Sequence, residues 1–275
     1  MTNNIPPFVL FGGPQISVDF ADALAEHGVE PDLVVCPEAK PVGRKQVMTN
    51  PPLADWAGRS GIFREQISDF SDQAFLENLA RFDLFVVVAY PKIIPKKLLD
   101  MPKHGTINLH PSLLPKYRGP SPIQTAILED DKNTGISLML LDEEMDHGPI
   151  VAQIPYPVDE WRKNRIHEKE MAELGAQSFL ETAPSYLDGS IKPKAQDHDQ
   201  ASYTHKFSKT DFEIFPDDDE YLMYRKYCAF EKPFFIENGK RYIVTEATFS
   251  GGRFVIGKVI PEGKNEQPYS GIFIR

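Results

Sequence analysis

Residues 106–153 read TINLHPSLLPKYRGPSPIQTAILEDDKNTGISLMLLDEEMDHGPIVAQ, and this stretch decides the fold that we expect. Its pattern predicts a strand at Thr106–Leu109, a helix at Ser121–Leu128 and further strands at Ile136–Leu141 and Ile150–Ile154. Strands that alternate with helices indicate an α/β fold, with a Rossmann-like, mostly parallel sheet and helices on both faces. Ligands of such sheets bind beyond the carboxyl ends of the strands.

The alternation continues on both sides of this stretch. Upstream strands are predicted at three short apolar runs, Phe8–Phe11, Leu33–Cys36 and Leu84–Ala89. Helical spacing of apolar residues predicts three more helices, at Ile16–His27, Asp72–Phe82 and Glu168–Leu187. We therefore expect one large domain over residues 1–190.

Two segments of the large domain carry turn-forming residues. Gly12-Gly13 follows the first strand but does not fit GxGxxG, which favours a tight turn over a dinucleotide site. Residues 37–52 show no periodicity and contain four prolines and three basic residues, Lys40, Arg44 and Lys45. This composition predicts a long loop, and long loops in compact domains are often functional.

The last part of the chain has a different pattern. Residues 191–219 are polar and predict a linker, and residues 220–275 predict a small β domain. The dipeptide Asn238-Gly239 between alternating runs is typical of a β-hairpin. Residues 206–275 hold 11 basic and 11 acidic side chains, so the net charge of −10 arises upstream.

Composition limits the classes of function. An acidic chain is unlike a general nucleic-acid binder, so any RNA contact needs a local basic patch, and we expect no DNA partner. There is no apolar run of eighteen residues and no signal-like N-terminus, which predicts a cytoplasmic protein without a membrane partner. The spacing of Cys36 and Cys228 fits neither a zinc site nor a disulfide framework, so two reduced thiols are expected.

Asn108 and His110 are the first candidates for chemistry. They stand two residues apart at the end of a predicted strand, so both side chains point to the same side, and Pro111 ends the strand. A carboxamide can donate to a developing oxyanion, and an imidazole can donate a proton or stabilise that charge. The alternative is structural, because Asn often caps turns and most histidines serve packing.

A carboxylate partner for the imidazole is available in the acidic segment downstream. Its four candidates are Asp142, Glu143, Glu144 and Asp146. Asp146 precedes His147-Gly148, where a glycine allows the chain to turn tightly toward a ligand. The alternative is a solvated acidic loop, and the spacing alone leaves this choice open.

The segments NLHPSLLPKYRGPSPIQ and TGISLMLLDEEMDHGPIV resemble the family of formyltransferases that use 10-formyltetrahydrofolate. The resemblance implies catalytic roles for Asn108, His110 and Asp146, with no metal. It also implies that Ser112, Leu113, Leu114 and Pro115 form a wall of the folate pocket, and that Asp142 contacts folate. VVVAYPKIIPKKLLDMP resembles the family segment that holds the pterin ring, which implies a contact at Tyr90. The family has glycine where this chain has Pro91.

Within the family, the chain most resembles the branch that formylates initiator methionyl-tRNA. KPVGRKQVMTNPP is similar to the loop with which that branch grips the acceptor end of the tRNA, which implies contacts by Arg44 and Lys45. The tail resembles a reduced form of the branch's OB-like C-terminal barrel. Lys116 and Arg118 are assigned equally to the glutamate tail of folate, a tRNA phosphate or plain surface.

Three other functions remain open at this point. The acceptor can be an amino sugar linked to a nucleotide, which the short tail and the acidic body favour. It can be water, as in a formyltetrahydrofolate hydrolase, although such enzymes usually carry a domain ahead of this fold, which here starts at residue 8. A non-catalytic RNA- or folate-binding protein is the third alternative, and an intact set of Asn108, His110 and Asp146 argues against it.

Overall fold

The computed structural model describes residues 5–43 and 45–271, and their contacts divide into two compact units. The first unit comprises the residues up to Arg118, Gly135–Tyr156 and Glu168–Ser202. The second comprises Gly119–Thr134, Pro157–His167 and the residues from Tyr203 onward. The units therefore interleave along the chain, and the expected boundaries at residues 190 and 219 stay a prediction.

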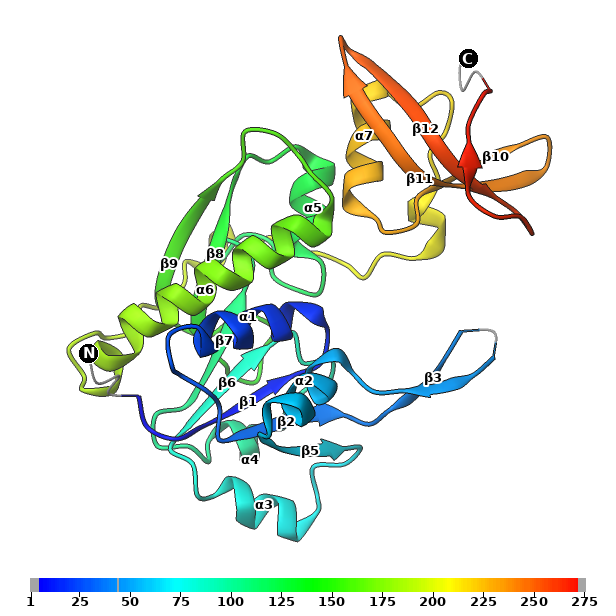
Figure 1. Cartoon of the computed structure of the whole chain (residues 1–275). Helices are drawn as coiled ribbons and strands as arrows, with labels where there is room; N and C mark the ends of the chain where they lie inside the picture. The colour runs from blue at the N-terminus through cyan, green and yellow to red at the C-terminus, as the bar shows by residue number, and fades with distance from the viewer. Residues whose placement is uncertain (1–4, 44, 272–275) are drawn as a thin grey trace. The chain divides into compact units, whose positions relative to one another are not determined.

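A seven-stranded sheet in the order β5-β2-β1-β6-β7-β8-β9 forms the centre of the first unit (Figure 1). Its strands are β1 (Phe8–Gly12), β2 (Leu33–Pro37), β5 (Phe63–Ile67), β6 (Leu84–Val88), β7 (Thr106–His110), β8 (Asn133–Leu140) and β9 (Ile150–Pro157). The helices that flank the sheet are α1 (Gln15–Ala25), α2 (Pro52–Ser60), α3 (Gln73–Leu79), α4 (Lys96–Leu99) and α6 (Asn164–Leu187). This arrangement confirms the predicted α/β class.

The strand order of the sheet contains a reversal. β1 pairs in parallel with β2 on one side and with β6 on the other, so the chain order reverses between β1 and β6. β7 continues the parallel part, and β8 runs antiparallel to β7. The carboxyl ends of strands at such a reversal are where open α/β sheets bind ligands.

Helices cover both faces of the sheet because its strands are buried on both. Phe8 of β1 packs on one face against Phe179 of α6, which also meets Phe20 of α1. The opposite face forms one apolar cluster that includes Phe11 and Phe75. A strand buried on both faces reads as a continuous apolar run, which explains why these strands were predictable.

Residues 37–52 do not form the expected long loop. They contain two short antiparallel strands, β3 (Lys40–Val42) and β4 (Val47–Thr49), with Val42 opposite Val47. All six strand residues are exposed, since the hairpin stands clear of the main sheet (Figure 1). The prediction was wrong because a strand without a buried face has no alternation of apolar and polar residues to detect.

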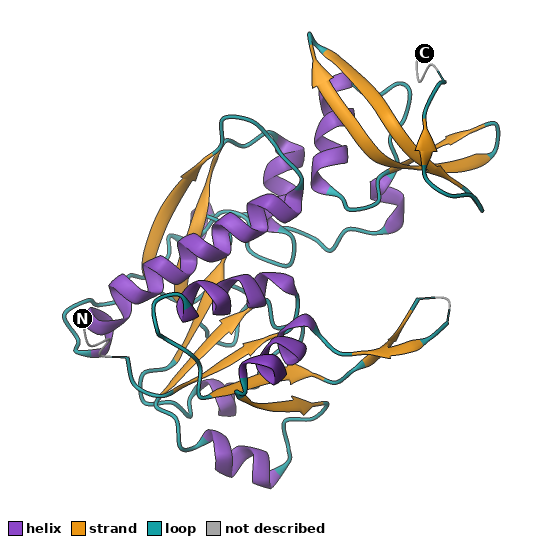
Figure 2. Cartoon of the chain, in the orientation of Figure 1, coloured by secondary structure: helices purple, strands orange, loops and turns teal. Residues whose placement is uncertain are grey.

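The second unit combines two helices with a four-stranded antiparallel sheet (Figure 2). The elements are α5 (Pro122–Glu129), α7 (Glu220–Ala229), β10 (Phe234–Glu237), β11 (Lys240–Ser250), β12 (Arg253–Pro261) and β13 (Gln267–Pro268). The predicted hairpin at Asn238-Gly239 is present, with both residues at positive φ. α7 was not predicted, because the acidic run before it read as linker, whereas Asp219 caps the helix by accepting from Tyr221 N and Leu222 N.

An apolar core and a set of hydrogen bonds hold the second unit together. The core consists of Ile214, Met223, Phe235, Val244, Ala247, Ile256 and Val259. Asp130, just after α5, accepts from Trp161 Nε1 at 2.7 Å and from the Tyr221 hydroxyl at 3.0 Å. Lys163 donates to the carbonyls of Tyr227 and Phe230 at the end of α7, at 2.6 and 2.9 Å. α5 and α7 therefore belong to one folded body with the sheet.

The two cysteines are free thiols, as predicted, and both are buried. Burial raises the pKa of Cys36 to about 12 and that of Cys228 to about 11, so neither thiol supplies a thiolate at neutral pH. In the part of the chain that the structure describes, no helix combines the length and apolar character that a membrane span requires.

Candidate functional site

Asn108 and His110 lie on one face of β7 at its carboxyl end. The two side chains are 8% and 4% exposed, so both are largely withdrawn from water. Leu109 between them points the other way and packs on α6, where a Cβ at Gly175 would come within 2.5 Å of Leu109 Cδ1. This close packing fixes the strand and therefore the direction of both polar side chains.

The imidazole of His110 lies between a carbonyl and a carboxylate. Nε2 lies 2.9 Å from the carbonyl oxygen of Tyr117, and because a carbonyl only accepts, this nitrogen carries a proton. Nδ1 faces Oδ1 of Asp146 at 3.6 Å. That distance is longer than a direct hydrogen bond, so Nδ1 is the ring nitrogen that can exchange a proton with a third group.

The carboxamide of Asn108 is available for a ligand. Its side chain has no hydrogen-bond partner among the residues that the structure describes. Asn108 and His110 thus lie at the carboxyl end of β7, and Asp146 faces His110.

The segment Ser112–Pro115 is held rigidly beside this edge. Ser137 on β8 donates to the carbonyl of Ser112 at 2.7 Å and accepts from the backbone N–H of Leu114 at 3.1 Å. Gln153 on β9 donates to the carbonyl of Leu114 at 2.8 Å and to Ser137 Oγ at 2.9 Å. Sequence reasoning missed Ser137 and Gln153, because their proximity depends on the register between strands.

Tyr90 follows β6 and is half-buried near the reversal of strand order. Its ring meets Phe11 edge-on at a centroid distance of 5.7 Å. Burial first, and then the neighbouring Cys36, raises the pKa of Tyr90 to about 12. Its buried hydroxyl has no hydrogen-bond partner among the described residues and stays protonated at neutral pH, so it can donate to a ligand.

The acidic segment divides into different roles. Asp142 Oδ2 lies 2.7 Å from Nδ1 of His147, and Asp142 Oδ1 accepts from the backbone of Glu144. Glu143 pairs with Lys96 at 3.3 Å on the surface. Asp146, held at a positive φ of 49°, is the member of the segment that faces His110. Of the four carboxylates that spacing left open, Asp146 is the one paired with His110, and its role stays a prediction.

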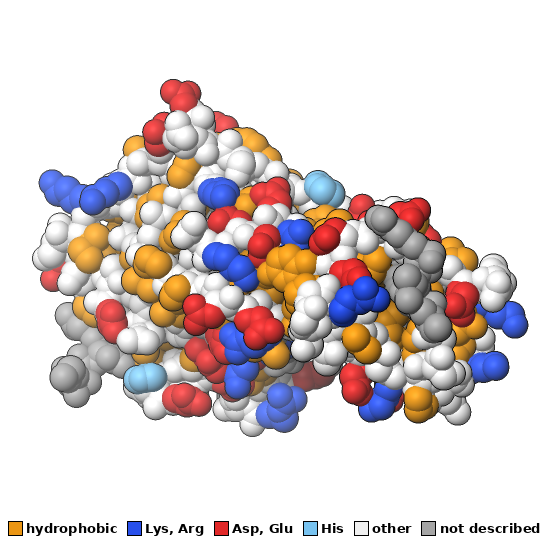
Figure 3. All heavy atoms as spheres, turned by 90° about the horizontal axis from the view of Figure 1, so that it is seen from above, with side chains coloured by type: hydrophobic (Ala, Val, Ile, Leu, Met, Phe, Trp, Pro, Cys, Tyr) orange, Lys and Arg blue, Asp and Glu red, His pale blue; other side chains and the backbone are white. Residues whose placement is uncertain are grey.

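The basic candidates that the structure describes differ in their exposure to solvent. Arg44 lies outside the described residues, and Lys45 is exposed at the tip of the β3–β4 hairpin. Lys116 is exposed and lies over the ring of Tyr117. Arg118 is 2% exposed and bonded to Gln196, so it is not the surface cation that its three sequence assignments assumed. On the face drawn in Figure 3, Lys and Arg side chains lie scattered among Asp and Glu.

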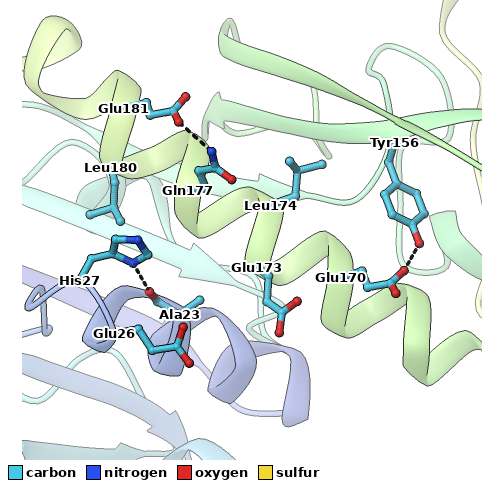
Figure 4. A pocket seen from close by; sticks show the side chains of 10 residues that line it. All are labelled: Ala23, Glu26, His27, Tyr156, Glu170, Glu173, Leu174, Gln177, Leu180 and Glu181. Carbon is cyan, nitrogen blue, oxygen red and sulfur yellow. Dashed lines mark hydrogen bonds between the residues drawn. The ribbon is translucent and has the colours of Figure 1, made fainter.

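Another hollow of the first unit is separate from this edge. Figure 4 shows a groove of about 790 Å³ between α1 and α6, whose lining includes four glutamates, at positions 26, 170, 173 and 181. Asn108, His110 and Asp146 do not line it. Within residues 5–43 and 45–271, no group of three or more His, Cys, Asp or Glu side chains could hold a metal ion.

Comparison with known proteins identifies the family. The family model described as formyl transferase matches residues 8–182. The chain belongs to the formyl transferase family. The methionyl-tRNA formyltransferase of Bacillus licheniformis is 39% identical over 198 residues, which are 71% of this chain and 62% of that protein. The methionyl-tRNA formyltransferase of Halalkalibacterium halodurans is 38% identical over 209 residues, 75% of this chain and 66% of that protein. The chain therefore spans less than two thirds of the length of each of these two relatives.

Solved structures share the fold at low identity. The methionyl-tRNA formyltransferase from Clostridium thermocellum has a TM-score of 0.62 at 16% identity, covering 97% of this formyl transferase and 100% of that chain. An N-formyltransferase from Helicobacter canadensis, in complex with folinic acid and dTDP-3-aminofucose, has a TM-score of 0.63 at 18% identity, covering 90% and 88%. HypX from Aquifex aeolicus, in complex with tetrahydrofolic acid, has a TM-score of 0.69 at 16% identity, covering 96% and 46%.

Proposed function

We propose that this formyl transferase moves the formyl group of 10-formyltetrahydrofolate onto the amino group of initiator methionyl-tRNA. The single observation that carries the chemistry is the set of Asn108, His110 and Asp146 at the carboxyl edge of the sheet. The identity of 38–39% to methionyl-tRNA formyltransferases supports the choice of acceptor.

Asn108 stabilises the charge that develops during transfer. Attack of the amine on the formyl carbon makes a tetrahedral intermediate with a negative oxygen, and the free carboxamide of Asn108 donates to that oxygen. An oxyanion donor in a site that excludes water is worth about 3–4 kcal/mol of barrier. The 8% exposure of Asn108 supports this role, since the gain depends on a low local dielectric.

His110 and Asp146 move the proton. The attacking amine must lose a proton, and the leaving nitrogen of the folate must gain one, so a group that accepts and returns a proton is needed. Nε2 of His110 is committed to the Tyr117 carbonyl, which leaves Nδ1, facing Asp146 at 3.6 Å, for this exchange. Asp146 stabilises the imidazolium while the proton resides on the ring.

The folate lies against the wall formed by Ser112, Leu113, Leu114 and Pro115, with Tyr90 and Asp142 as further contacts. The hydrogen bonds from Ser137 and Gln153 support this assignment, because they hold the wall in one conformation. The protonated hydroxyl of Tyr90 supplies a donor for the pterin side of the ligand. No step of this mechanism needs a metal ion.

The β3–β4 hairpin is the proposed contact for the acceptor end of the tRNA. Lys45 at its tip is exposed, and the apolar side chains Val42, Val47 and Met48 are 55–63% exposed. Cationic groups position phosphates, and exposed apolar groups can pack on unpaired nucleotides. Arg44, which precedes Lys45 in the sequence, is proposed for the same contact.

An amino sugar linked to a nucleotide is the second candidate acceptor. One observation favours it, namely that residues 206–275 carry equal numbers of basic and acidic side chains. A charge-neutral module contributes little to phosphate binding, whereas a small acceptor does not need such a surface. The β3–β4 hairpin argues for the larger acceptor.

Incubation with 10-formyltetrahydrofolate and each acceptor in turn separates the two. Mass spectrometry of the amino acid released from the tRNA and of the sugar nucleotide detects an added formyl group. We expect it on methionine from methionyl-tRNA and not on the sugar. Formylation of the sugar alone would support the second candidate, and formylation of neither would contradict the proposed function.

A further inference from the structure

Gln196 clamps the backbone of the segment that carries Asp146. Its Nε2 donates to the carbonyl of Asp146 at 2.9 Å and to the carbonyl of Gly148 at 2.8 Å. These carbonyls flank His147, so one amide group spans the turn. Gln196 is 6% exposed, and Gly148 can take no side chain, because a Cβ would lie 2.0 Å from the carbonyl oxygen of Leu140.

Arg118 fixes the orientation of that amide. Its Nε and Nη2 lie 3.2 and 2.7 Å from Oε1 of Gln196, and the guanidinium can only donate. Oε1 must therefore accept, which directs both N–H groups of Nε2 toward the two carbonyls. The same guanidinium donates through Nη2 to Nδ1 of His198 at 2.8 Å.

The segment Tyr117-Arg118 connects the two catalytic arms. The Tyr117 carbonyl accepts from His110, while the adjacent Arg118 side chain holds Gln196 and through it Asp146. Ser202 ties this segment down, since its Oγ accepts from Tyr117 N at 2.9 Å and its carbonyl accepts from Arg118 N at 2.8 Å. One short segment thus sets the position of both the imidazole and the carboxylate.

A second connection joins the same groups through stacked rings. His198 stacks on His147 with ring centroids 4.0 Å apart and an interplanar angle of 6°. His147 in turn bonds to Asp142, at the start of the acidic segment. Residues 142–148 are therefore held near both ends by partners that lead back to Arg118.

We propose that Gln196 and Arg118 are positioning residues that hold Asp146 in register with His110 during formyl transfer. This inference rests on the proposed function, since it assigns the pair a task in that reaction. Neither residue touches the reacting atoms. Their task is to keep Asp146 at a positive φ, a conformation that non-glycine residues rarely adopt without support.

Gln196→Leu tests the inference, because leucine is close in volume and removes both donors. We expect kcat to fall on the order of 10²-fold, the loss associated with a misplacement of about 1 Å, while the KM for 10-formyltetrahydrofolate changes little. Gln177→Leu, at an exposed position on α6, is the matched control and should keep wild-type kinetics. An equal loss in kcat and in folate binding would overturn the inference.

Non-additivity separates positioning from a general structural role. In an Asp146→Asn background, Gln196→Leu should lower kcat by less than about threefold, because the carboxylate that it positions is already absent. Arg118→Lys, which keeps the charge and loses the paired contacts, should behave in the same way. A full additional loss in the Asp146→Asn background would contradict the positioning role.

A structural readout separates this inference from the proposed function. Crystal structures of wild type and of Gln196→Leu should show Asp146 displaced from His110 only in the variant, with the rest of the fold unchanged. Asp146 unmoved in the variant would overturn the inference even if the wild type is active. Failure of the wild type to formylate any acceptor would instead contradict the proposed function and leave the displacement of Asp146 to be judged by itself.

Discussion

The carboxyl edge of the main sheet and the C-terminal module are built on opposite principles. At the edge, buried polar side chains such as His110, Arg118 and Gln196 are held by hydrogen bonds. In the C-terminal module, which comprises residues 206–275, an apolar core supports the sheet. The 11 basic and 11 acidic side chains of the module balance each other. The buried polar contacts proposed to serve the chemistry are therefore concentrated at the edge. The C-terminal module, by contrast, is a folded body without a strong electrostatic attraction for RNA.

The largest effect is expected at the edge, from His110→Ala. Loss of the group that exchanges the proton should lower kcat by about 10³-fold, within the range for general acid–base catalysis. His27→Ala, in the turn after α1, is the control and should leave activity unchanged. Steady-state kinetics and a thermal melt of each variant provide the measurement. A folded His110→Ala variant with wild-type kcat would contradict the proposed role of His110 in proton transfer.

Gln153→Leu tests the wall beside the edge rather than the chemistry. The variant loses two hydrogen bonds that hold Leu114 and Ser137, each worth about 1 kcal/mol. We expect the KM for 10-formyltetrahydrofolate to rise about tenfold, with kcat within about threefold of wild type. A fall in kcat without a rise in KM would show that the wall serves the reaction and not folate binding.

The contrast in RNA contact is tested with two lysines at hairpin turns, one in each unit. Lys45→Ala should raise the KM for tRNA about fivefold and reduce the salt dependence of binding by about one phosphate contact. Lys240→Ala, at the exposed start of β11, should change neither. Equal effects of the two changes would mean that the C-terminal module also contacts the tRNA. No effect of Lys45→Ala would contradict the proposed tRNA contact of the β3–β4 hairpin.

The smallest effect concerns the stability of the second unit, to which Lys163 belongs. Burial lowers the pKa of Lys163 from 10.5 to about 8, so between these values the unfolded chain binds more protons than the folded one. The free energy of unfolding should therefore rise with pH across this window, as the cost of burying a charged lysine disappears.

Urea denaturation at about pH 7.5 and about pH 9.5 measures this rise. Lys163→Met should remove it, and Lys169→Met on the exposed face of α6 should not. The raised pKa values of Cys36 and Cys228 act in the opposite direction above about pH 9, and those of Tyr221 and Tyr224 above about pH 10. The contribution of Lys163 is therefore the difference between the changes measured for wild type and for Lys163→Met. A rise that persists in Lys163→Met would assign it to other groups.

Most strands and helices of the main sheet were predictable because their signals are local, whereas β5, α2 and α4 were not predicted. A continuous apolar run such as Leu84–Val88 or a cap such as Asp72 is visible without knowledge of the fold. The β3–β4 hairpin was missed because all its residues are exposed, and α7 was missed because its capping aspartate lies in an acidic run.

The candidate site was predictable only in part. Asn108 and His110 follow from a spacing of two on one strand, but the choice of Asp146 among four carboxylates needed the family resemblance. Gln196 was not predictable, because it meets Arg118 across 78 positions of the chain. Contacts of that range depend on how the loops return to the sheet, which no local pattern encodes.

The most direct test of the central claim is a single-turnover measurement of formyl transfer by Asn108→Ala. With saturating 10-formyltetrahydrofolate and methionyl-tRNA, we expect the single-turnover rate of formyl transfer to be about 10²–10³-fold below wild type, because the oxyanion loses its donor. Asn133→Ala, at the exposed start of β8, should transfer the formyl group at the wild-type rate. A correctly folded Asn108→Ala variant that transfers the formyl group as fast as wild type would contradict the account.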